Sequence, residues 1–362
     1  MGRPKIEINF KSVAATAIER SARGVVGLVL VDKGVTLKTD PLSMTDITDA
    51  PDGLSPENKK EVSLAFDGYS GATKKVMLTV VNKGDDQTLQ DTDFVNACKK
   101  FLNTDVTYIA VPDADTHAKA VADFVTGTRG ATKASQLKAV LTGVKADNEA
   151  IINSTTNGLV AGSETYTAAQ YTPRIAAVLA TCPMTSSATY YVLSDLDNCE
   201  YIEDEALDSA IDAGELKVFW DGEKVKIARA VNSLTTTTAD KPEEMKKIRT
   251  VDTLDTIRHD IHRTLEDNYV GRYPNSATYK QMVCNAINGY YEELIGQGAI
   301  ESGNCEIDLD KQRTYLKQKG KAVDKMSDVE LLNANTDSHV FLKGSTQPLD
   351  AMEDIEYDIS LN

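Results

Sequence analysis

The sequence lacks any apolar run near the roughly 20 residues that a membrane-spanning helix requires. Its first residues, MGRPKIEINFKS, also lack the apolar centre of a secretory signal, and Ile6 stands where a myristoylation signal carries Ser or Thr. We therefore expect no insertion into a membrane and synthesis in the cytoplasm. The 362 residues are 41% hydrophobic and 26% charged, which predicts a globular protein of about two or three domains.

Cysteine and positive charge are both scarce. The five cysteines form no CxxC pair, which indicates reduced, mostly buried thiols instead of a disulfide framework or a zinc site. Lysine and arginine number 39 against 55 aspartates and glutamates, so the formal net charge is −16. Binding to a phosphate backbone depends on clustered cations. We therefore do not expect nucleic acid as a partner.

The signatures of common enzymes are missing as well. There is no GxGxxG or GxxxxGK(S/T) nucleotide loop, no GxSxG nucleophile turn and no HExxH zinc motif. His259 and His262 lie three apart in a predicted helix without a third ligand nearby, so we interpret them as part of a solvated or interfacial face. The carboxylates of DAMEDIEYD lack the glycine and ligand order of a calcium loop and are interpreted as the acidic face of a strand. We expect neither a cofactor nor enzymatic activity.

Buried strands alternate with amphipathic helices through most of the chain. GVVGLVLVDKG and KKVMLTVVN are continuous apolar runs, typical of strands covered on both faces, and DTDFVNACKKFLN and AAQYTPRIAAVLATCPM have helical spacing. This order predicts an α/β core with a largely parallel or mixed sheet. The last third is predicted as α+β. It contains a long helix capped by Asp240 with Pro242 in its first turn, a second helix in SATYKQMVCNAINGYYEELIGQG, and a strand in CEIDLD.

Both ends of the sequence have the period-two pattern of a half-buried strand, and neither has an obvious neighbour in sequence. The segment GSTQPLD, with Gly344 and Pro348, is interpreted as a loop, so no hairpin partner lies just before the last strand. The apolar members of the two arms are Ile6, Ile8, Phe10, Ile355, Tyr357, Ile359 and Leu361. An unpaired strand invites pairing with another chain. Because the donor strand and the acceptor edge are different surfaces, such contacts build rings or open helices, and we predict a polymer-forming structural protein.

Five cations stand out in this acidic protein. They fall in the long predicted helix and are Lys246, Lys247, Arg249, Arg258 and Arg263. One interpretation is a solvated helix face whose cations pair with nearby Glu and Asp. The alternative is a docking face for an acidic partner, for which charge sets orientation and encounter rate more than affinity.

Four longer stretches are spread from Ile8 to Leu361. They are INFKSVAATAIERSARGVVGLVL, ARAVNSLTT, KKIRTVDTLDTIRHDIHRTLEDNYVGR and VFLKGSTQPLDAMEDIEYDISL. In length and order they resemble the contractile tail sheath proteins of Gram-positive myophages, defective prophages and phage-tail-like bacteriocins. Between about residues 35 and 196 the resemblance lies in the order of the elements.

The resemblance implies a sheath of stacked six-subunit rings around a rigid tail tube, which contracts to drive the tube through a cell envelope. The implied partners are further copies of the chain, the tail tube protein, and the baseplate and tail terminator proteins, in a virion or phage-tail-like particle assembled in the host cytoplasm. Both arms would add strands to neighbouring subunits, with hinges at residues 12–23 and 344–351, and we infer that the five cations face the tube.

The implied domains are an N-terminal arm with the first core strand (1–34), an outer α/β domain (35–198), an inner α+β domain (199–344) and a C-terminal strand arm (345–362). Two other hypotheses stay open. An α/β enzyme would need a convergent polar pocket and leaves the arms unexplained. A non-contractile filament, tube or surface-layer protein explains the arms but not the resemblance over the whole chain.

Overall fold

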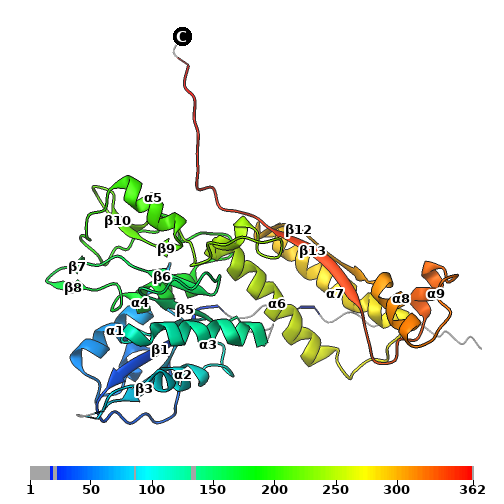
Figure 1. Cartoon of the computed structure of the whole chain (residues 1–362), viewed down its shortest axis with the longest axis horizontal. Coiled ribbons are helices and arrows are strands. Elements are labelled where there is room, and N and C mark those ends of the chain that lie inside the picture. Colours follow the sequence, from blue (N-terminus) through cyan, green and yellow to red (C-terminus); the bar gives the residue numbers. More distant parts are fainter. Residues whose placement is uncertain (1–16, 19–22, 85–86, 132–135, 361–362) are drawn as a thin grey trace, which may run out of the picture. The chain divides into compact units, whose positions relative to one another are not determined.

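The computed structural model describes residues 17–18, 23–84, 87–131 and 136–360. The chain divides into two compact units, and Figure 1 shows their helices and strands. Unit 1 comprises Met1–Arg20 and Asp260–Leu349, and unit 2 comprises Ser21–His259 and Asp350–Asn362. None of the helices in the described ranges combines the length and the hydrophobicity of a membrane span. The four-part division predicted from the sequence concerns inner and outer domains of an assembly and stays a prediction.

A seven-stranded sheet forms the centre of unit 2. All of its strands run parallel except β2, which pairs antiparallel with β3 at one edge. The order across the sheet is β2 (Leu42–Met44), β3 (Lys75–Asn82), β1 (Val25–Asp32), β4 (Tyr108–Ala110), β5 (Lys138–Leu141), β6 (Ile151–Ser154) and β9 (Glu215–Leu216). The predicted α/β core with a mixed sheet is therefore confirmed.

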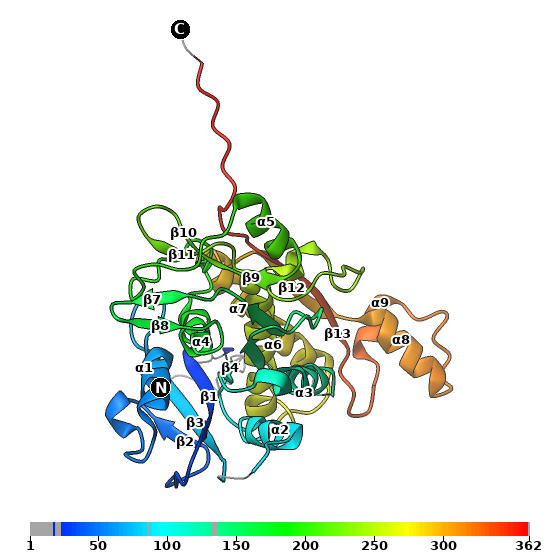
Figure 2. The same cartoon turned by 60° about the vertical axis from the view of Figure 1, so that its left-hand side comes forward.

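Helices cover both faces of this sheet. On one face, α1 (Pro56–Phe66) and α4 (Thr172–Thr181) pack on Val26, Leu28 and Leu30 of β1. On the other face, α2 (Asp91–Lys99) and α3 (Ala118–Ala131) pack on Val25 and Val29. Figure 2 shows β1 and β3 between α1 on one side and α2 and α3 on the other. Because successive side chains of a strand point to opposite faces, the continuous apolar run of β1 is what a strand buried on both sides requires.

Shorter elements complete unit 2. They are η1 (Ile47–Asp49), η2 (Asp115–His117), β7 (Leu159–Ala161), β8 (Glu164–Tyr166), α5 (Asp204–Asp212), β10 (Val218–Trp220), β11 (Val225–Ile227) and η3 (Glu243–Lys246). The predicted hairpin with an Asp221-Gly222 turn is confirmed, since β10 and β11 pair antiparallel. Gly222 takes a φ of 99°, a left-handed value that glycine adopts without strain. Asp221 accepts hydrogen bonds from the backbone N–H groups of Glu223 and Lys224.

The long helix α6 (Ile248–Asn268) begins later than predicted. Asp240 and Pro242 were expected to open it, but the chain forms only the short η3 there, and Lys247 is extended with φ −83° and ψ 127°. The reason is a backbone pairing. The Asn232 N–H donates to the Lys246 carbonyl at 2.9 Å, and the Ile248 N–H donates to the Ala230 carbonyl at 3.1 Å. These tertiary bonds flank Lys247 and hold it extended between η3 and α6.

Unit 1 contains the end of α6 and an α+β arrangement, as predicted. Its further elements are α7 (Ala277–Gly296), β12 (Ile300–Ile307), α8 (Leu309–Gln318), α9 (Asp328–Asn333) and β13 (Leu342–Pro348). The capping box predicted at α9 is present, because Ser327 and Glu330 each accept from the other's backbone N–H. One prediction was wrong: GSTQPLD is largely strand, not loop, since β13 pairs antiparallel with β12.

Candidate assembly interface

The C-terminal arm carries apolar side chains that are left in solvent. Residues 351–360 form neither helix nor strand, and Figure 1 draws them as an extended red trace. Ile355, Tyr357 and Ile359 are 81%, 80% and 71% exposed. Leu361 and the N-terminal arm positions Ile6, Ile8 and Phe10 lie outside the described residues. Three regularly spaced apolar side chains in water are suited to pairing with a sheet edge.

Strands β12 and β13 of unit 1, which α8 and α9 separate in the sequence, form a sheet of two strands only, so far as the described residues go. Gly344 lies in the middle of β13 opposite Cys305. A β-carbon at Gly344 would lie 2.1 Å from the carbonyl oxygen of Asn304, so only glycine fits this close approach of the two backbones. The residue that suggested a loop in the sequence is therefore what allows the strands to pair.

Helix α7 supports this two-stranded sheet through contacts with β12. The Asn288 side chain accepts from the backbone N–H of Cys305 at 2.7 Å and donates to its carbonyl at 3.0 Å. At Gly303 the strand approaches the ring of Tyr291 so closely that a β-carbon would lie 2.6 Å from it. These contacts occupy the outer edge of β12 at Cys305. In the described part of the chain, β13 pairs with no strand other than β12, and its outer edge is the candidate acceptor.

The five predicted cations do not form one helix face. Lys246 lies in η3 and pairs with Glu243 at 2.8 Å, and Lys247 lies in the extended segment and pairs with Asp350. Arg249 is only 8% exposed, and its Nε donates to the carbonyl of Met184 at 3.1 Å. Burial lowers the pKa of Arg249.

Arg258 and Arg263 are the two cations whose side chains are most exposed. Their side chains are 49% and 60% exposed, with Asp255 and Asp267 at 3.9 and 3.8 Å respectively. The structure thus brings Lys247 to the base of the C-terminal arm and leaves Arg258 and Arg263 in solvent on α6. A contact of these residues with a tube stays a prediction.

Two carboxylates of α6 are buried against the sheet of unit 2. Asp252 accepts from Tyr108 Oη at 2.7 Å and from Arg23 Nη2 at 3.0 Å. Asp255 accepts two bonds from Arg129, at 2.7 and 3.0 Å, and one from Lys138 Nζ at 2.9 Å. The sequence predicted the apolar stripe of this helix but missed these acids, because their cations lie more than a hundred residues earlier in the chain.

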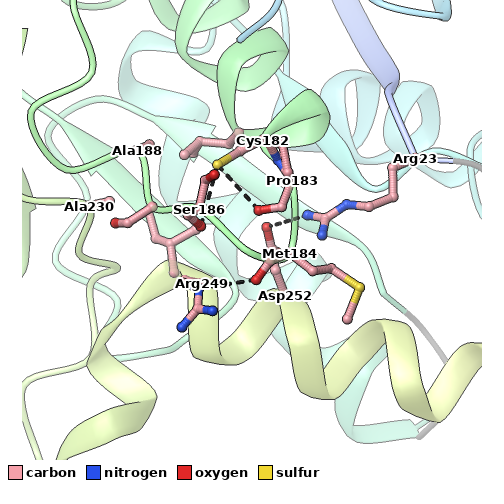
Figure 3. Close-up of a pocket in the computed structure, with 12 residues that line it drawn as sticks. Arg23, Cys182, Pro183, Met184, Ser186, Ala188, Ala230, Arg249 and Asp252 are labelled. Carbon is pink, nitrogen blue, oxygen red and sulfur yellow. Dashed lines mark hydrogen bonds and ion pairs between the residues drawn. The ribbon is translucent and has the colours of Figure 1, made fainter. Parts of the chain in front are cut away.

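A small hollow lies beside the start of α6 (Figure 3). Its lining includes two hydrogen-bonded pairs, Arg23 with Asp252 and Arg249 with the carbonyl of Met184, together with Cys182 and Ser186. Its volume is about 10 Å³, room for about one water molecule. Such a space does not hold a substrate.

The remaining candidate metal ligands do not come together in the structure. His262 lies 3.5 Å from Glu266, and within the described ranges no three His, Cys, Asp or Glu side chains gather as metal ligands. The five cysteines, all of them described, are buried, which confirms that part of the expectation, and none lies in a disulfide in the structure.

Comparisons with known proteins decide the family. Residues 240–362 match the family model described as the phage tail sheath C-terminal domain. Over 367 aligned positions, which cover 99% of both chains, the sequence is 35% identical to the tail sheath protein of Clostridium phage phiCD119. The chain belongs to the phage tail sheath protein family. The resemblance stated from the sequence is confirmed.

Solved structures of sheath proteins share the fold. The sheath tail protein from Desulfitobacterium hafniense matches with a TM-score of 0.70 at 17% identity, over 84% of this chain and 94% of its own. The helical sheath of the anti-feeding prophage in its contracted state matches with a TM-score of 0.69 at 16% identity, over 100% of both chains. A chain in the baseplate of the same particle, solved with sixfold symmetrisation, matches with a TM-score of 0.67 at 13% identity, over 100% of this chain and 99% of its own.

Proposed function

We propose that this sheath protein is the structural, non-enzymatic subunit of a contractile tail sheath. Copies of it stack as six-subunit rings around a tail tube, and the sheath contracts to drive the tube through the target cell envelope. The observation that carries the proposal is the agreement over the whole length, both with a tail sheath protein and with the fold of a contracted helical sheath. The sixfold baseplate match supports the ring number and a baseplate partner.

Strand donation by the C-terminal arm joins the subunits in this proposal. Ile355, Tyr357, Ile359 and Leu361 add a strand to the outer edge of β13 in a neighbouring copy, and Ile6, Ile8 and Phe10 act in the same way at the other end of the chain. Burying an apolar side chain contributes ~1.5–3 kcal/mol. Ordering the backbone costs ~1–2 kcal/mol per residue. The two nearly cancel, so one arm binds weakly and a lattice of many arms binds tightly.

The other parts of the particle follow from this arrangement. The inner domain (199–344) with the first segment (1–34) carries the strand exchange and faces the tube, and the middle domain (35–198) lies outside. Arg258 and Arg263 are available for contact with an acidic tube surface, because their side chains are 49% and 60% exposed. Assembly takes place in the host cytoplasm, and the finished sheath is part of a virion or phage-tail-like particle capped by a terminator protein.

Electron microscopy of the purified chain tests the proposal. We compare the full chain with a truncation that ends at Asp354 and with a triple substitution of Ile355, Tyr357 and Ile359 by serine. We expect wide hollow cylinders from the full chain and folded monomers from both variants. The full chain with Asp358→Asn, a change on the exposed arm that keeps its apolar positions, is the control and is expected to polymerise.

Two outcomes would contradict the proposal. If the full chain stays monomeric under assembly-promoting salt and concentration, strand donation is not its assembly mechanism. If cylinders form but have one length and diameter under all conditions, the protein is a non-contractile filament subunit.

A further inference from the structure

We propose that the base of the C-terminal arm is clamped to unit 2 of its own chain through Glu353, so that the arm leaves the subunit from a fixed point. This arm clamp consists of three acidic residues on the arm and four residues on the body of unit 2: Asp350, Glu353 and Asp354, with Ser187, Thr189, Arg229 and Lys247. Its role in assembly rests on the proposed function, but its existence does not.

Burial singles out Glu353 within an otherwise exposed segment. Met352 is 93% exposed and Ile355 is 81% exposed, whereas the Glu353 side chain is 6% exposed. An ionised carboxylate leaves water only where hydrogen bonds or charges replace its hydration. Glu353 is thus turned inward while its apolar neighbours remain in solvent. If the hydrophobic effect alone placed the arm on the surface, the apolar side chains would be buried and the carboxylate exposed.

Two hydroxyl groups are oriented toward this carboxylate. Glu353 Oε1 accepts from Ser187 Oγ at 3.0 Å and from Thr189 Oγ1 at 2.6 Å. Each hydroxyl oxygen also accepts a backbone hydrogen bond: Thr189 N–H donates to Ser187 Oγ at 3.1 Å, and Ala230 N–H donates to Thr189 Oγ1 at 3.0 Å. The Thr189 hydroxyl therefore donates its proton to Glu353, and the Ser187 hydroxyl has two acceptors at 3.0 Å, Glu353 Oε1 and Thr189 Oγ1.

Two cations complete the clamp. Glu353 Oε2 lies 3.6 Å from Arg229 Nε and 3.7 Å from Lys247 Nζ. Arg229 Nη2 also donates to both carboxylate oxygens of Asp354, at 2.6 and 2.7 Å, and Lys247 pairs with Asp350. The hydrogen bond to Asp354 raises the pKa of Arg229 and lowers that of Asp354. Three acids of the arm therefore share two cations of the body.

The four body residues come from three separate segments that are themselves fixed. Ser187 and Thr189 follow α4, Arg229 follows β11, and Lys247 precedes α6. Lys247 is bridged to Val231 by backbone pairing, and the Ala230 N–H binds Thr189. An arm attached here starts from a rigid platform, and only residues 355–362 remain to search for a neighbour. A shorter tether raises the effective concentration of the donor strand and reduces the ordering cost of its binding.

Spin-label mobility in the full chain tests the clamp directly. A nitroxide is attached at Met352→Cys, which is accessible, whereas the native cysteines are buried. We expect slow motion at 352 in the otherwise unchanged chain, several-fold faster motion after Glu353→Gln, and no change after Glu356→Gln, the same substitution at an exposed arm carboxylate. A label at Tyr357→Cys serves as the reference for a free arm. Equal mobility at 352 and 357 in the unchanged chain, or no effect of Glu353→Gln, overturns the clamp.

The critical concentration for polymerisation tests its role in assembly. Loosening the clamp at Glu353 lengthens the free tether from residues 355–362 toward residues 350–362, so we expect Glu353→Gln to raise the critical concentration by up to about twofold. Glu356→Gln is expected to leave it unchanged. If Glu353→Gln frees the label but leaves the critical concentration as it was, the role in assembly is refuted. If the unchanged chain forms no polymer, the proposed function fails, and the label mobility still decides whether the clamp exists.

Discussion

Glu61 is a carboxyl group of unit 2 that is buried without a cation. It lies on α1, is 4% exposed, and its Oε2 has no hydrogen-bond partner. Burial, together with the nearby charges of Asp113 and Glu57, raises its pKa from 4.5 to about 8. At neutral pH the folded protein therefore holds this group protonated, whereas an unfolded chain would release the proton.

Substituting Glu61 should make stability less dependent on pH. Because the folded pKa is raised, the stability linked to this group is fully present below pH 4.5 and is lost as pH rises to about 8. We expect Glu61→Gln, which cannot ionise, to be more stable than the unchanged protein by about 3–5 kcal/mol at pH 8 and by less than about 1 kcal/mol at pH 5. Urea unfolding of the monomer at both pH values measures this. Glu205→Gln on the exposed helix α5 is the control, and a parallel pH profile for Glu61→Gln and the unchanged chain would contradict the expectation.

Single residues show where the sequence was informative and where it was not. The period-two spacing of Ile355, Tyr357 and Ile359 was visible because it is a local pattern, and their high exposure is consistent with a partner outside the monomer. The inward turn of Glu353 was not visible, since its partners lie more than a hundred residues earlier in the chain. The acidic residues around Glu353 instead predicted a solvated face, which is what such a run usually forms.

At the scale of elements, the buried acids of α6 fix this helix to the sheet of unit 2. Burial alone would raise the pKa of Asp255, but the charges of Lys138 and Arg129 hold it below its ordinary value. We expect Asp255→Asn to destabilise the fold by about 3–5 kcal/mol, because it leaves two buried cations with one carboxylate fewer. Thermal unfolding measures the loss. Asp267→Asn, at a side chain that is 67% exposed, should change stability by less than about 0.5 kcal/mol. Equal effects of the two substitutions would count against the network.

The pairing of β12 with β13 depends on Gly344. Gly344→Ala places a β-carbon 2.1 Å from the Asn304 carbonyl oxygen, so one strand must shift. We expect a loss of about 1–3 kcal/mol and faster amide hydrogen exchange over residues 342–348. Lys343→Ala, one position earlier with its side chain 46% exposed, is the control and should preserve protection. Protection that is unchanged in Gly344→Ala would show that the β12–β13 sheet tolerates the shift.

Elements with a local cause were predicted well, and elements with a distant cause were not. The buried strands β1 and β3, the hairpin at Asp221-Gly222 and the capping box of α9 follow from neighbouring residues. The late start of α6 follows from backbone bonds to residues 230 and 232. The sequence pattern near Asp240 does not reveal these backbone bonds. β13 was missed because glycine and proline usually indicate a loop. Gly344 is compatible with a strand only because β12 lies so close to it, which the sequence does not show.

At the scale of the whole molecule, the net charge of −16 opposes association of identical chains. The Debye length falls from ~30 Å at 0.01 M salt to ~8 Å at 0.15 M. Added salt therefore weakens the long-range repulsion between chains more than it weakens short-range contacts. We expect the critical concentration for polymerisation to fall several-fold between these two salt concentrations. Sedimentation of polymer from a dilution series measures it, with the truncation at Asp354 as the control that stays soluble. A critical concentration that rises with salt would mean that ion pairs between chains dominate.

The position of the arm clamp also determines where a pulling force enters the subunit. Strand β13 ends at Pro348, just before the clamp begins at Asp350. Without the clamp, tension on the arm would peel β13 from β12 one residue pair at a time, starting at the pair of Pro348 with Ile300. With Glu353 and Asp354 held by Arg229 and Lys247, tension on the arm is borne by the body of unit 2 before it reaches the β12–β13 sheet. In the sheath proposed above, the arms would carry tension while the β12–β13 sheet of each subunit stays intact to accept the arm of a neighbour.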